Sequence, residues 1–362
     1  MEQKGSFLFI PDISGFTNFV KDIEINHSQH IISELLELII DANELDLTLA
    51  EIEGDAVFFY KYREIPSILD ILNQVQKMYT NFHTHIKRYE RDRICHCGAC
   101  SQAVNLKLKI IAHAGQFNLV KVKEFQKPFG KDVITIHNLL KNDIREKEYL
   151  LLSKQLLQNL DTEYIRQPLE WPVLKAGHTE YEKIGRIQYE YANLSPLQQY
   201  ISPPPPVPSE PLTRNPLIFQ TQIRKPIEDI FELVSNFNYR LQWNKKVNQF
   251  DYEKDKMNRI GARHICVIGS QTLEFKTVSN DFGNNKLVYG ETTSHIPLVK
   301  KASTYFILES IPQGTKLRIE VHYKPRPILG WLTTPMFKRF ISKTMNDALL
   351  SIKKISEENK RI

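Results

Sequence analysis

Hydrophobic and polar residues follow two different patterns along this chain of 362 residues. In the first half, short apolar runs predict strands, and apolar residues spaced three and four apart predict the helices between them. The predicted elements run strand, helix, strand, strand, helix, strand, then a further strand and helix, over 7–10, 28–43, 45–52, 57–60, 65–89, 104–113, 116–122 and 133–142. Segments 149–153 and 181–191 predict additional edge strands. This βαββαβ order predicts a ferredoxin-like α+β domain, an antiparallel sheet covered by helices.

After residue 212 the pattern changes to one helix, many strands and a long final helix. The predicted ranges are 217–223, 226–236, 249–252, 264–267, 271–280, 286–292, 302–310, 315–323 and 334–355. Gly283-Asn284-Asn285 and Pro312-Gln313-Gly314 predict hairpin turns. The last helix is amphipathic, so we expect the strands to form a sheet that packs against it.

A proline-rich stretch separates these two regions. Residues 202–211 read Ser-Pro-Pro-Pro-Pro-Val-Pro-Ser-Glu-Pro, a composition that favours extended polyproline II. It acts as a semi-rigid spacer or as a ligand for a proline-binding module. The predicted domains are therefore 1–195 and 213–362, joined by a linker over 196–212.

Composition narrows the class of protein. A hydrophobic content of 41% and a charged content of 25% are typical of a globular protein. No stretch approaches the roughly 20 apolar residues of a membrane span, and no signal peptide precedes the first strand. Four cysteines, three of them clustered, are not typical of a secreted disulfide framework. We expect a cytoplasmic protein without a transmembrane segment.

The net charge of +6 is unevenly distributed. From Thr213 onward, 25 Lys and Arg residues face 14 Asp and Glu residues, against 23 and 28 in the rest of the chain. A basic second half suits an anionic partner, a lipid surface for example, or is simply a solvated basic surface. Since the charge is the only feature in its favour, we expect no nucleic-acid partner.

Two acidic segments carry the first candidate chemistry. In 7–17, an apolar strand leads to Asp12 and then turns through Gly15 into a helix, and in 45–60 a strand ends at Gly54-Asp55 before the next strand. Two aspartates at neighbouring strand ends can share a hard cation such as Mg²⁺. Backbone amides that open a helix can receive phosphate. The alternatives are a helix N-cap for Asp12 and a hairpin-turn residue for Asp55.

These two segments resemble the Asp-Ile-x-Gly-Phe-Thr and Gly-Asp-Ala motifs of class III nucleotidyl cyclase catalytic domains. Residues 110–115 and 129–134 resemble two further motifs of that family, in the same order. The resemblance covers about the first 160 residues. It implies Mg²⁺ or Mn²⁺, a nucleoside triphosphate, and a homodimer through this domain. The implied metal ligands are Asp12, Ile13 and Asp55, and the implied nucleotide-binding residues are Gly15, Phe16, Thr17, Glu51, Gly54 and Lys127.

The same resemblance argues against efficient turnover. Ile134 stands where the family has the asparagine that orients the ribose, and Asn138 stands where it has the transition-state arginine. Loss of a comparable arginine costs roughly 10³-fold or more in rate. No catalytic residue is therefore assigned. Glu51 favours guanine over adenine weakly, because the partner position, Lys127, fits neither type.

A cysteine cluster follows the second long helix. Cys95, Cys97 and Cys100, with His96 between them, form a Cys-x-Cys-x-x-Cys pattern that predicts a Zn²⁺ site. Three thiolates need a fourth ligand, for which His83, His85, a water or a second chain are alternatives. A tight turn with buried or redox-sensitive thiols is the other interpretation.

The second half resembles the START-like (SRPBCC) helix-grip fold. The resemblance rests on the element order, on residues 225–231 and on Trp243. This family usually encloses a hydrophobic cavity, although the same residues could fill a solid core. The expected cavity residues are Phe275, Tyr289, Tyr305, Phe337, Phe340, Ile341 and Met345.

Three functions follow from these patterns. The preferred one is a regulatory protein in signal transduction: a nearly inactive, nucleotide-binding cyclase-like domain joined to a START-like domain that binds an apolar molecule or lipid. The second is an active cyclase that makes cyclic GMP or cyclic AMP. The third is a lipid- or metabolite-binding protein whose cyclase-like half is a structural remnant.

Overall fold

The computed structural model describes residues 5–16, 19, 25–95, 98–163, 171–207, 209–254, 256–294, 296, 298–328 and 330–358. The chain divides into two compact units. The first unit comprises residues 1–90 and 101–204, and the second comprises 91–100 and 205–362. The chain passes from the first unit to the second between Pro204 and Pro205, within the proline-rich stretch. Residues 91–100, which the sequence places in the first domain, pack with the second unit, where Ile94 joins the hydrophobic core.

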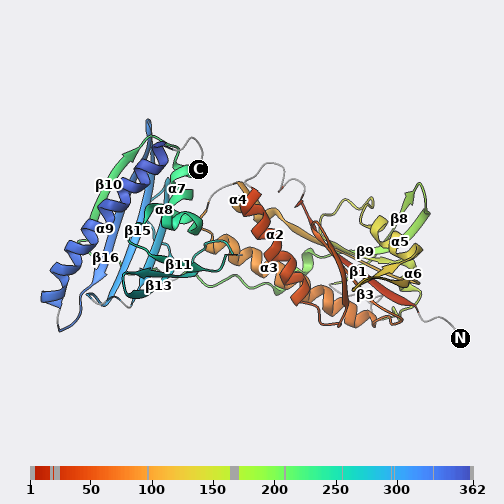
Figure 1. The fold of residues 1–362 in the computed structure, drawn as a ribbon. Helices are drawn as coiled ribbons and strands as arrows, with labels where there is room; N and C mark the ends of the chain where they lie inside the picture. Colours follow the sequence, from red (N-terminus) through yellow and green to blue (C-terminus); the bar gives the residue numbers. More distant parts are fainter. Residues whose placement is uncertain are drawn as a thin grey trace. The chain divides into compact units, whose positions relative to one another are not determined.

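A seven-stranded sheet forms the first unit (Figure 1). Its strand order is β2-β3-β1-β4-β7-β9-β8, and the four strands β4-β1-β3-β2 give the antiparallel ferredoxin-like core that the sequence predicts. The strands are β1 (Ser6–Ser14), β2 (Thr48–Glu53), β3 (Ala56–Lys61), β4 (Lys107–Gly115), β7 (Tyr149–Ser153), β8 (Lys175–Tyr181) and β9 (Gly185–Asn193). A separate two-stranded sheet pairs β5 (Asn118–Val122) with β6 (Phe125–Phe129).

The strands differ from the prediction in several places, and β6 was not predicted. β1 continues to Ser14, so Asp12 lies inside the strand and not after it. β7 is an interior strand between β4 and β9, parallel to β4 and buried along its whole length. Segment 181–191 spans the turn of the β8–β9 hairpin, which begins at Lys175. Sheet position depends on pairing between distant segments, which local periodicity does not report.

Helices cover both faces of this sheet. α2 (Ile25–Asp41) and α3 (Ile68–Asp92) run beside each other, and α5 (Lys131–Leu139) packs on β4 and β1 (Figure 1). The core beneath α5 contains Leu8, Ile10 and Phe58. Since β1 is buried on both faces, its residues from Phe7 to Pro11 are all apolar. The short helices are α4 (Gly98–Gln102) and α6 (Lys154–Leu157), with 3₁₀ turns at Ala103–Asn105 and Ser195–Tyr200.

The second unit is an antiparallel sheet of seven strands in the order β10-β16-β15-β14-β13-β12-β11. The strands are β10 (Leu217–Ile223), β11 (Gln249–Tyr252), β12 (Arg263–Ile268), β13 (Gln271–Val278), β14 (Lys286–Thr293), β15 (Lys301–Ile311) and β16 (Gly314–Lys324). All seven were predicted within a few residues. At the turn into β16, Gly314 has a φ of 131° and a Cβ there would lie 2.2 Å from the Ile223 carbonyl oxygen, so only glycine fits.

The long helix α9 (Gly330–Glu358) runs along this sheet beside β10 (Figure 1). It begins one turn before the predicted start, so Pro335 lies within its N-terminal part. The other helices are α7 (Ile227–Ser235), which was predicted, and the single turn α8 (Arg240–Trp243), which was not, with a 3₁₀ turn at Phe237–Tyr239. A long helix packed against an antiparallel sheet is the predicted START-like arrangement. The two units together give the predicted α+β class.

Across the described parts of the chain, no helix combines the length and apolarity that crossing a bilayer needs.

Candidate functional site

The two aspartates singled out in the sequence meet at the β1–β3 junction of the first unit. Asp12 pairs in register with Ala56, and the Ile13 amide donates to the Asp55 carbonyl at 3.0 Å. On the other side of β1, Asp12 pairs in register with Lys109 of β4. The Lys109 ammonium lies 3.2 Å from Oδ1 of Asp12. The site therefore contains the two predicted carboxylates. It also contains one cationic side chain, Lys109, which the sequence analysis did not identify.

Burial sets the electrostatics of this group. It raises the pKa of Asp12 to about 6, an effect that Lys109 opposes and the Asp55 carboxylate reinforces. Burial also raises the pKa of Asp55, against the influence of Lys109. The raised pKa values mean that the surroundings of both carboxylates stabilise their ionised forms less well than water does. A divalent cation, bound by carboxylate oxygens, would relieve this charge.

The neighbouring phosphate-binding candidates are only partly described. Gly15 has a φ of 95°, and its carbonyl accepts from the Phe19 amide at 3.1 Å. Gly54 has a φ of 63° and forms, with Asp55, the two-residue turn between β2 and β3. Thr17 lies outside the described residues. The positive φ at both glycines explains why the turn after β1 and the turn between β2 and β3 need glycine.

The two positions expected to read the base contact each other. Nζ of Lys127, on β6, donates to Oε2 of Glu51, on β2, at 3.1 Å. A similar pair forms beside it, where Nδ1 of His137 lies 3.5 Å from Oε2 of Glu53. The carboxylate of Glu51 is therefore engaged by this chain's own lysine.

The positions of the missing catalytic groups lie on α5. Ile134 is 56% exposed and offers only hydrocarbon. Asn138 donates its amide to the Ile134 carbonyl at 2.8 Å, so its side chain is hydrogen-bonded to its own helix. His137, on the same helix, faces Glu53. These contacts supply nothing that resembles the family's ribose and transition-state groups.

A serine, a histidine and an aspartate also meet in the first unit. Nδ1 of His113 lies 2.7 Å from the Ser153 hydroxyl, and its Nε2 lies 3.3 Å from Oδ1 of Asp132. Both His113 and Ser153 are almost fully buried, and the Ser153 hydroxyl accepts from the Leu156 amide as the cap of α6. A substrate cannot reach this buried hydroxyl. The three side chains therefore have a structural role, since their hydrogen bonds connect α5 and α6 to the sheet.

The cysteine cluster lies in segment 91–100. Cys95 is half-buried and Cys100 is buried, and their sulfur atoms lie within 4.8 Å of each other. Two thiols this close to each other can share a Zn²⁺ ion. His96 and Cys97 lie outside the described residues.

The two histidines considered as a fourth ligand have other partners. Nε2 of His83 lies 2.5 Å from Glu148, and Nε2 of His85 lies 3.0 Å from Glu34.

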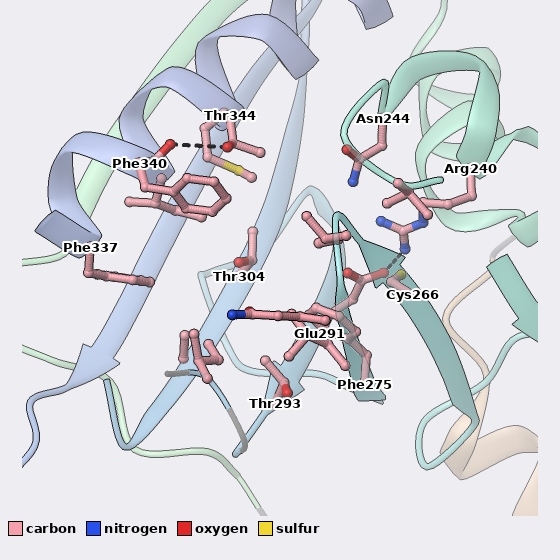
Figure 2. Close-up of a pocket in the computed structure, with 18 of the residues that line it drawn as sticks. Arg240, Asn244, Cys266, Phe275, Glu291, Thr293, Thr304, Phe337, Phe340 and Thr344 are labelled. Atoms are coloured by element: carbon pink, nitrogen blue, oxygen red, sulfur yellow. Dashed lines mark hydrogen bonds and ion pairs between the residues drawn. The ribbon is translucent and has the colours of Figure 1, made fainter. Parts of the chain in front are cut away.

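The second unit encloses a cavity of about 330 Å³ between its sheet and α9 (Figure 2). Five of the seven residues expected in a cavity line it: Phe275, Phe337, Phe340, Ile341 and Met345. The lining continues over the sheet and the loop before β15 through apolar residues such as Leu273, Leu298 and Phe306.

Tyr289 and Tyr305 do not line this cavity. Tyr289 is fully buried in the core behind it, stacked on Phe306. Tyr305 lies on the opposite face of β15, where its ring covers Gly290. Because consecutive residues of a strand point to opposite faces, Phe306 takes the place in the cavity that the sequence analysis gave to Tyr305.

One end of the cavity is polar, which the sequence analysis did not anticipate. Arg240, on α8, forms an ion pair with Glu291, on β14, and both side chains are almost fully buried. Nη2 of Arg240 also donates to the Tyr289 hydroxyl at 2.9 Å, and that hydroxyl donates to Glu291. Figure 2 shows Phe337 and Phe340 on the α9 side and Arg240, Asn244 and Glu291 across the cavity from them.

Comparisons with known proteins agree with this architecture. A family described as "Polyketide cyclase / dehydrase and lipid transport" matches residues 219–357, which confirms the START-like resemblance of the second half. A family described as a protein of unknown function (DUF2652) matches residues 32–149. The uncharacterized protein Rv2561/Rv2562 of Mycobacterium tuberculosis is 34% identical over 176 residues, which are 49% of this chain and 77% of that protein.

Solved structures similar to each half have low sequence identity. The guanylate cyclase domain of RhGC from Catenaria anguillulae, in complex with GTP, is 14% identical with a TM-score of 0.38, covering 53% of this chain and 97% of that one. A bacterial light-regulated adenylyl cyclase is 12% identical with a TM-score of 0.37, covering 54% and 96%. A START superfamily protein from Mycobacterium smegmatis is 17% identical with a TM-score of 0.31, covering 40% and 97%. Cyclase domains are the family that the motifs of the first half resemble.

Proposed function

This chain belongs to the same family as the uncharacterized Mycobacterium tuberculosis protein, and we propose that its second unit binds an apolar small molecule in the cavity beneath α9. The observation that carries the proposal is the cavity itself. A volume of about 330 Å³ lies within the range of roughly 300–1,000 Å³ in which small molecules are bound. The matched family, whose description includes lipid transport, supports a lipid or a similar metabolite as the ligand.

The lining supports an apolar ligand because α9 contributes several large hydrophobic side chains to one wall. Phe337 and Met345 are buried at the base of this wall, whereas Phe340 and Ile341 are more exposed. Apolar surface that faces an apolar ligand is removed from water, which stabilises the complex by roughly 25 cal/mol per Å².

A hydrocarbon probe tests this proposal. Diphenylhexatriene fluoresces strongly only in apolar surroundings, so its titration into the full chain should show saturable binding. Met345→Trp, which fills the cavity, should abolish the signal. Met336→Trp adds the same side chain at an exposed position of α9 outside the cavity and should leave binding unchanged. Equal binding by both variants, or none by the wild type, contradicts the proposal.

As a second function, we propose that the first unit binds a nucleoside triphosphate with Mg²⁺ or Mn²⁺ and turns it over poorly, as a regulatory module. The supporting observation is the pair Asp12 and Asp55, whose pKa values burial raises, next to the two glycine turns. The contacts of Ile134 and Asn138 support poor turnover. In the family that the motifs resemble, such sites form between two chains, so this proposal implies a homodimer through the first unit.

Thermal unfolding tests the nucleotide proposal. GTP or ATP with Mn²⁺ at 100 times its Kd should stabilise the first unit by about 2.7 kcal/mol. Asp12→Ala and Asp55→Ala should remove the effect, whereas Glu180→Gln, a charge change at an exposed position of β8, should keep it. Analytical ultracentrifugation with and without nucleotide tests the homodimer. If no nucleotide raises the unfolding temperature of the wild type, the interpretation of the first unit as a structural remnant is preferred.

We also propose that Cys95 and Cys100 share a Zn²⁺ ion in segment 91–100. The closeness of their sulfur atoms supports this proposal. With further protein ligands completing its four-coordinate sphere, bound zinc would have a structural role and stabilise the local fold.

A further inference from the structure

The cavity of the second unit has two chemically different ends. Its wall on α9 is aromatic and aliphatic, while Arg240, Asn244 and Glu291 lie opposite (Figure 2). A ligand that fills the cavity therefore places one part against hydrocarbon and another against polar atoms. Polar groups that converge in an otherwise apolar pocket fix the orientation and identity of the ligand.

The polar end is already balanced in charge. The Arg240 guanidinium is paired with Glu291, whose Oε1 also accepts from Tyr289 and lies 3.5 Å from Nε2 of His264. Burial and the nearby Arg240 lower the pKa of His264 to about 2, so this imidazole adds no positive charge at neutral pH. A ligand carboxylate placed here would meet the Glu291 carboxylate and add an unpaired charge, which is strongly unfavourable in a buried site.

One hydroxyl in the cavity wall is left without a partner. Thr293, at the end of β14, lines the cavity and is only 4% exposed. Within the described residues, its Oγ1 has no hydrogen-bond partner. Buried hydroxyls are normally paired, so an unpaired one facing a cavity indicates a group that arrives with the ligand.

We propose that the cavity selects apolar molecules that end in an uncharged hydrogen-bonding group, a hydroxyl or a carbonyl, over the corresponding free acids. This inference rests on the proposed apolar-ligand function. Thr293 supplies the unsatisfied hydrogen bond, and the Arg240–Glu291 pair discriminates against negative charge. The ligand's hydrocarbon part lies against Phe337, Phe340 and Met345.

Competition with diphenylhexatriene on the full chain tests the selection. At pH 8, where the acid is ionised, 1-decanol should displace the probe at a concentration at least about tenfold lower than decanoic acid, because an unpaired buried charge costs more than a neutral hydrogen bond gains. Glu291→Gln leaves Arg240 unpaired and should reverse this preference.

Two threonine variants separate the hydrogen bond from the shape of the wall. Thr293→Val should lower the affinity for 1-decanol about three- to tenfold and leave diphenylhexatriene binding unchanged. Thr344→Val is the matched control, since Thr344 also lines the cavity but its hydroxyl already donates to the Phe340 carbonyl at 3.0 Å. It should lower the affinity for 1-decanol less than Thr293→Val does.

The outcomes distinguish this inference from the function on which it rests. If diphenylhexatriene does not bind the wild type, the apolar-ligand function itself fails. If the probe binds but the acid competes as well as the alcohol, only the selection for an uncharged group is overturned. The same holds if Thr293→Val behaves like Thr344→Val. The threonine comparison remains decisive if Glu291→Gln does not fold.

Discussion

Nζ of Lys109 lies 3.2 Å from Oδ1 of Asp12, directly across the β1–β4 strand pair. This lysine places a positive charge within reach of the carboxylates that are the proposed metal ligands. Its charge lowers the pKa values of both Asp12 and Asp55, the same effect that a bound cation has. A divalent cation bound by these carboxylates would therefore compete with Lys109 for the same negative charge.

The first prediction follows from this competition. Lys109→Met should raise the affinity for Mn²⁺ by about tenfold or more, because it removes a unit charge a few ångströms from the metal. Electron paramagnetic resonance of free Mn²⁺ measures the affinity. Lys107→Met, two residues away on β4, removes a lysine that faces Glu148 at 3.7 Å and should have little effect. Equal affinities of wild type and Lys109→Met would show that the cation binds elsewhere or not at all.

The second prediction concerns turnover. Purified protein with GTP or ATP and Mn²⁺ should form little or no cyclic nucleotide, because Ile134 and Asn138 supply neither ribose contacts nor positive charge. The double variant Ile134→Asn with Asn138→Arg restores both types of group and should increase the rate. Cyclic GMP and cyclic AMP are measured by chromatography. A robust wild-type rate that Asp55→Ala abolishes contradicts this prediction and favours an active cyclase.

The third prediction is that the cysteine cluster holds about one Zn²⁺ ion per chain. Elemental analysis of reduced protein, purified without added metal, gives the ratio. The triple variant Cys95→Ser, Cys97→Ser and Cys100→Ser should lose the metal, whereas Cys266→Ser, which changes a buried cysteine on β12, should retain it. Metal-free wild-type protein would support a turn with free thiols.

The fourth prediction is an acid-sensitive second unit. In the unfolded chain His264 titrates near 6.5, whereas burial lowers its pKa to about 2 in the fold. Between these values the unfolded chain binds one more proton, so stability falls as the pH falls. His264 should lower the free energy of unfolding by about 1.4 kcal/mol for each pH unit below about 6.5.

Urea unfolding at pH 7.5, 6.5 and 5.5 measures this loss. A Trp171→Phe background leaves Trp243 and Trp331 as tryptophans of the second unit, so fluorescence reports on that unit. His264→Phe suits the cluster of Phe237, Phe250 and Phe275 around this side chain and should remove the pH dependence that His264 causes. The same slope with and without His264 argues against a buried neutral imidazole.

The sequence by itself determined the order of most elements and the proline-rich stretch between the two regions. Alternation of period two and helical spacing are local properties, so all seven strands of the second unit and the four core strands of the first could be predicted from short windows. The motif around Asp12 and the turn at Gly54-Asp55 could be identified for the same reason, because each lies within a few consecutive residues.

The tertiary structure decided which side chains meet. Register places Lys109 beside Asp12 and Lys127 beside Glu51, and it depends on pairing across many intervening residues. The middle of β15, Tyr305 to Leu308, is buried and apolar on both faces, so its sequence did not show that Phe306 and not Tyr305 lines the cavity.

The polar end of that cavity was equally hidden. Arg240 lies on a single helical turn that has no clear periodicity, and its partner Glu291 is 51 positions further along the chain. A buried ion pair is stable only where the fold brings both charges out of water together, which no local pattern of residues encodes.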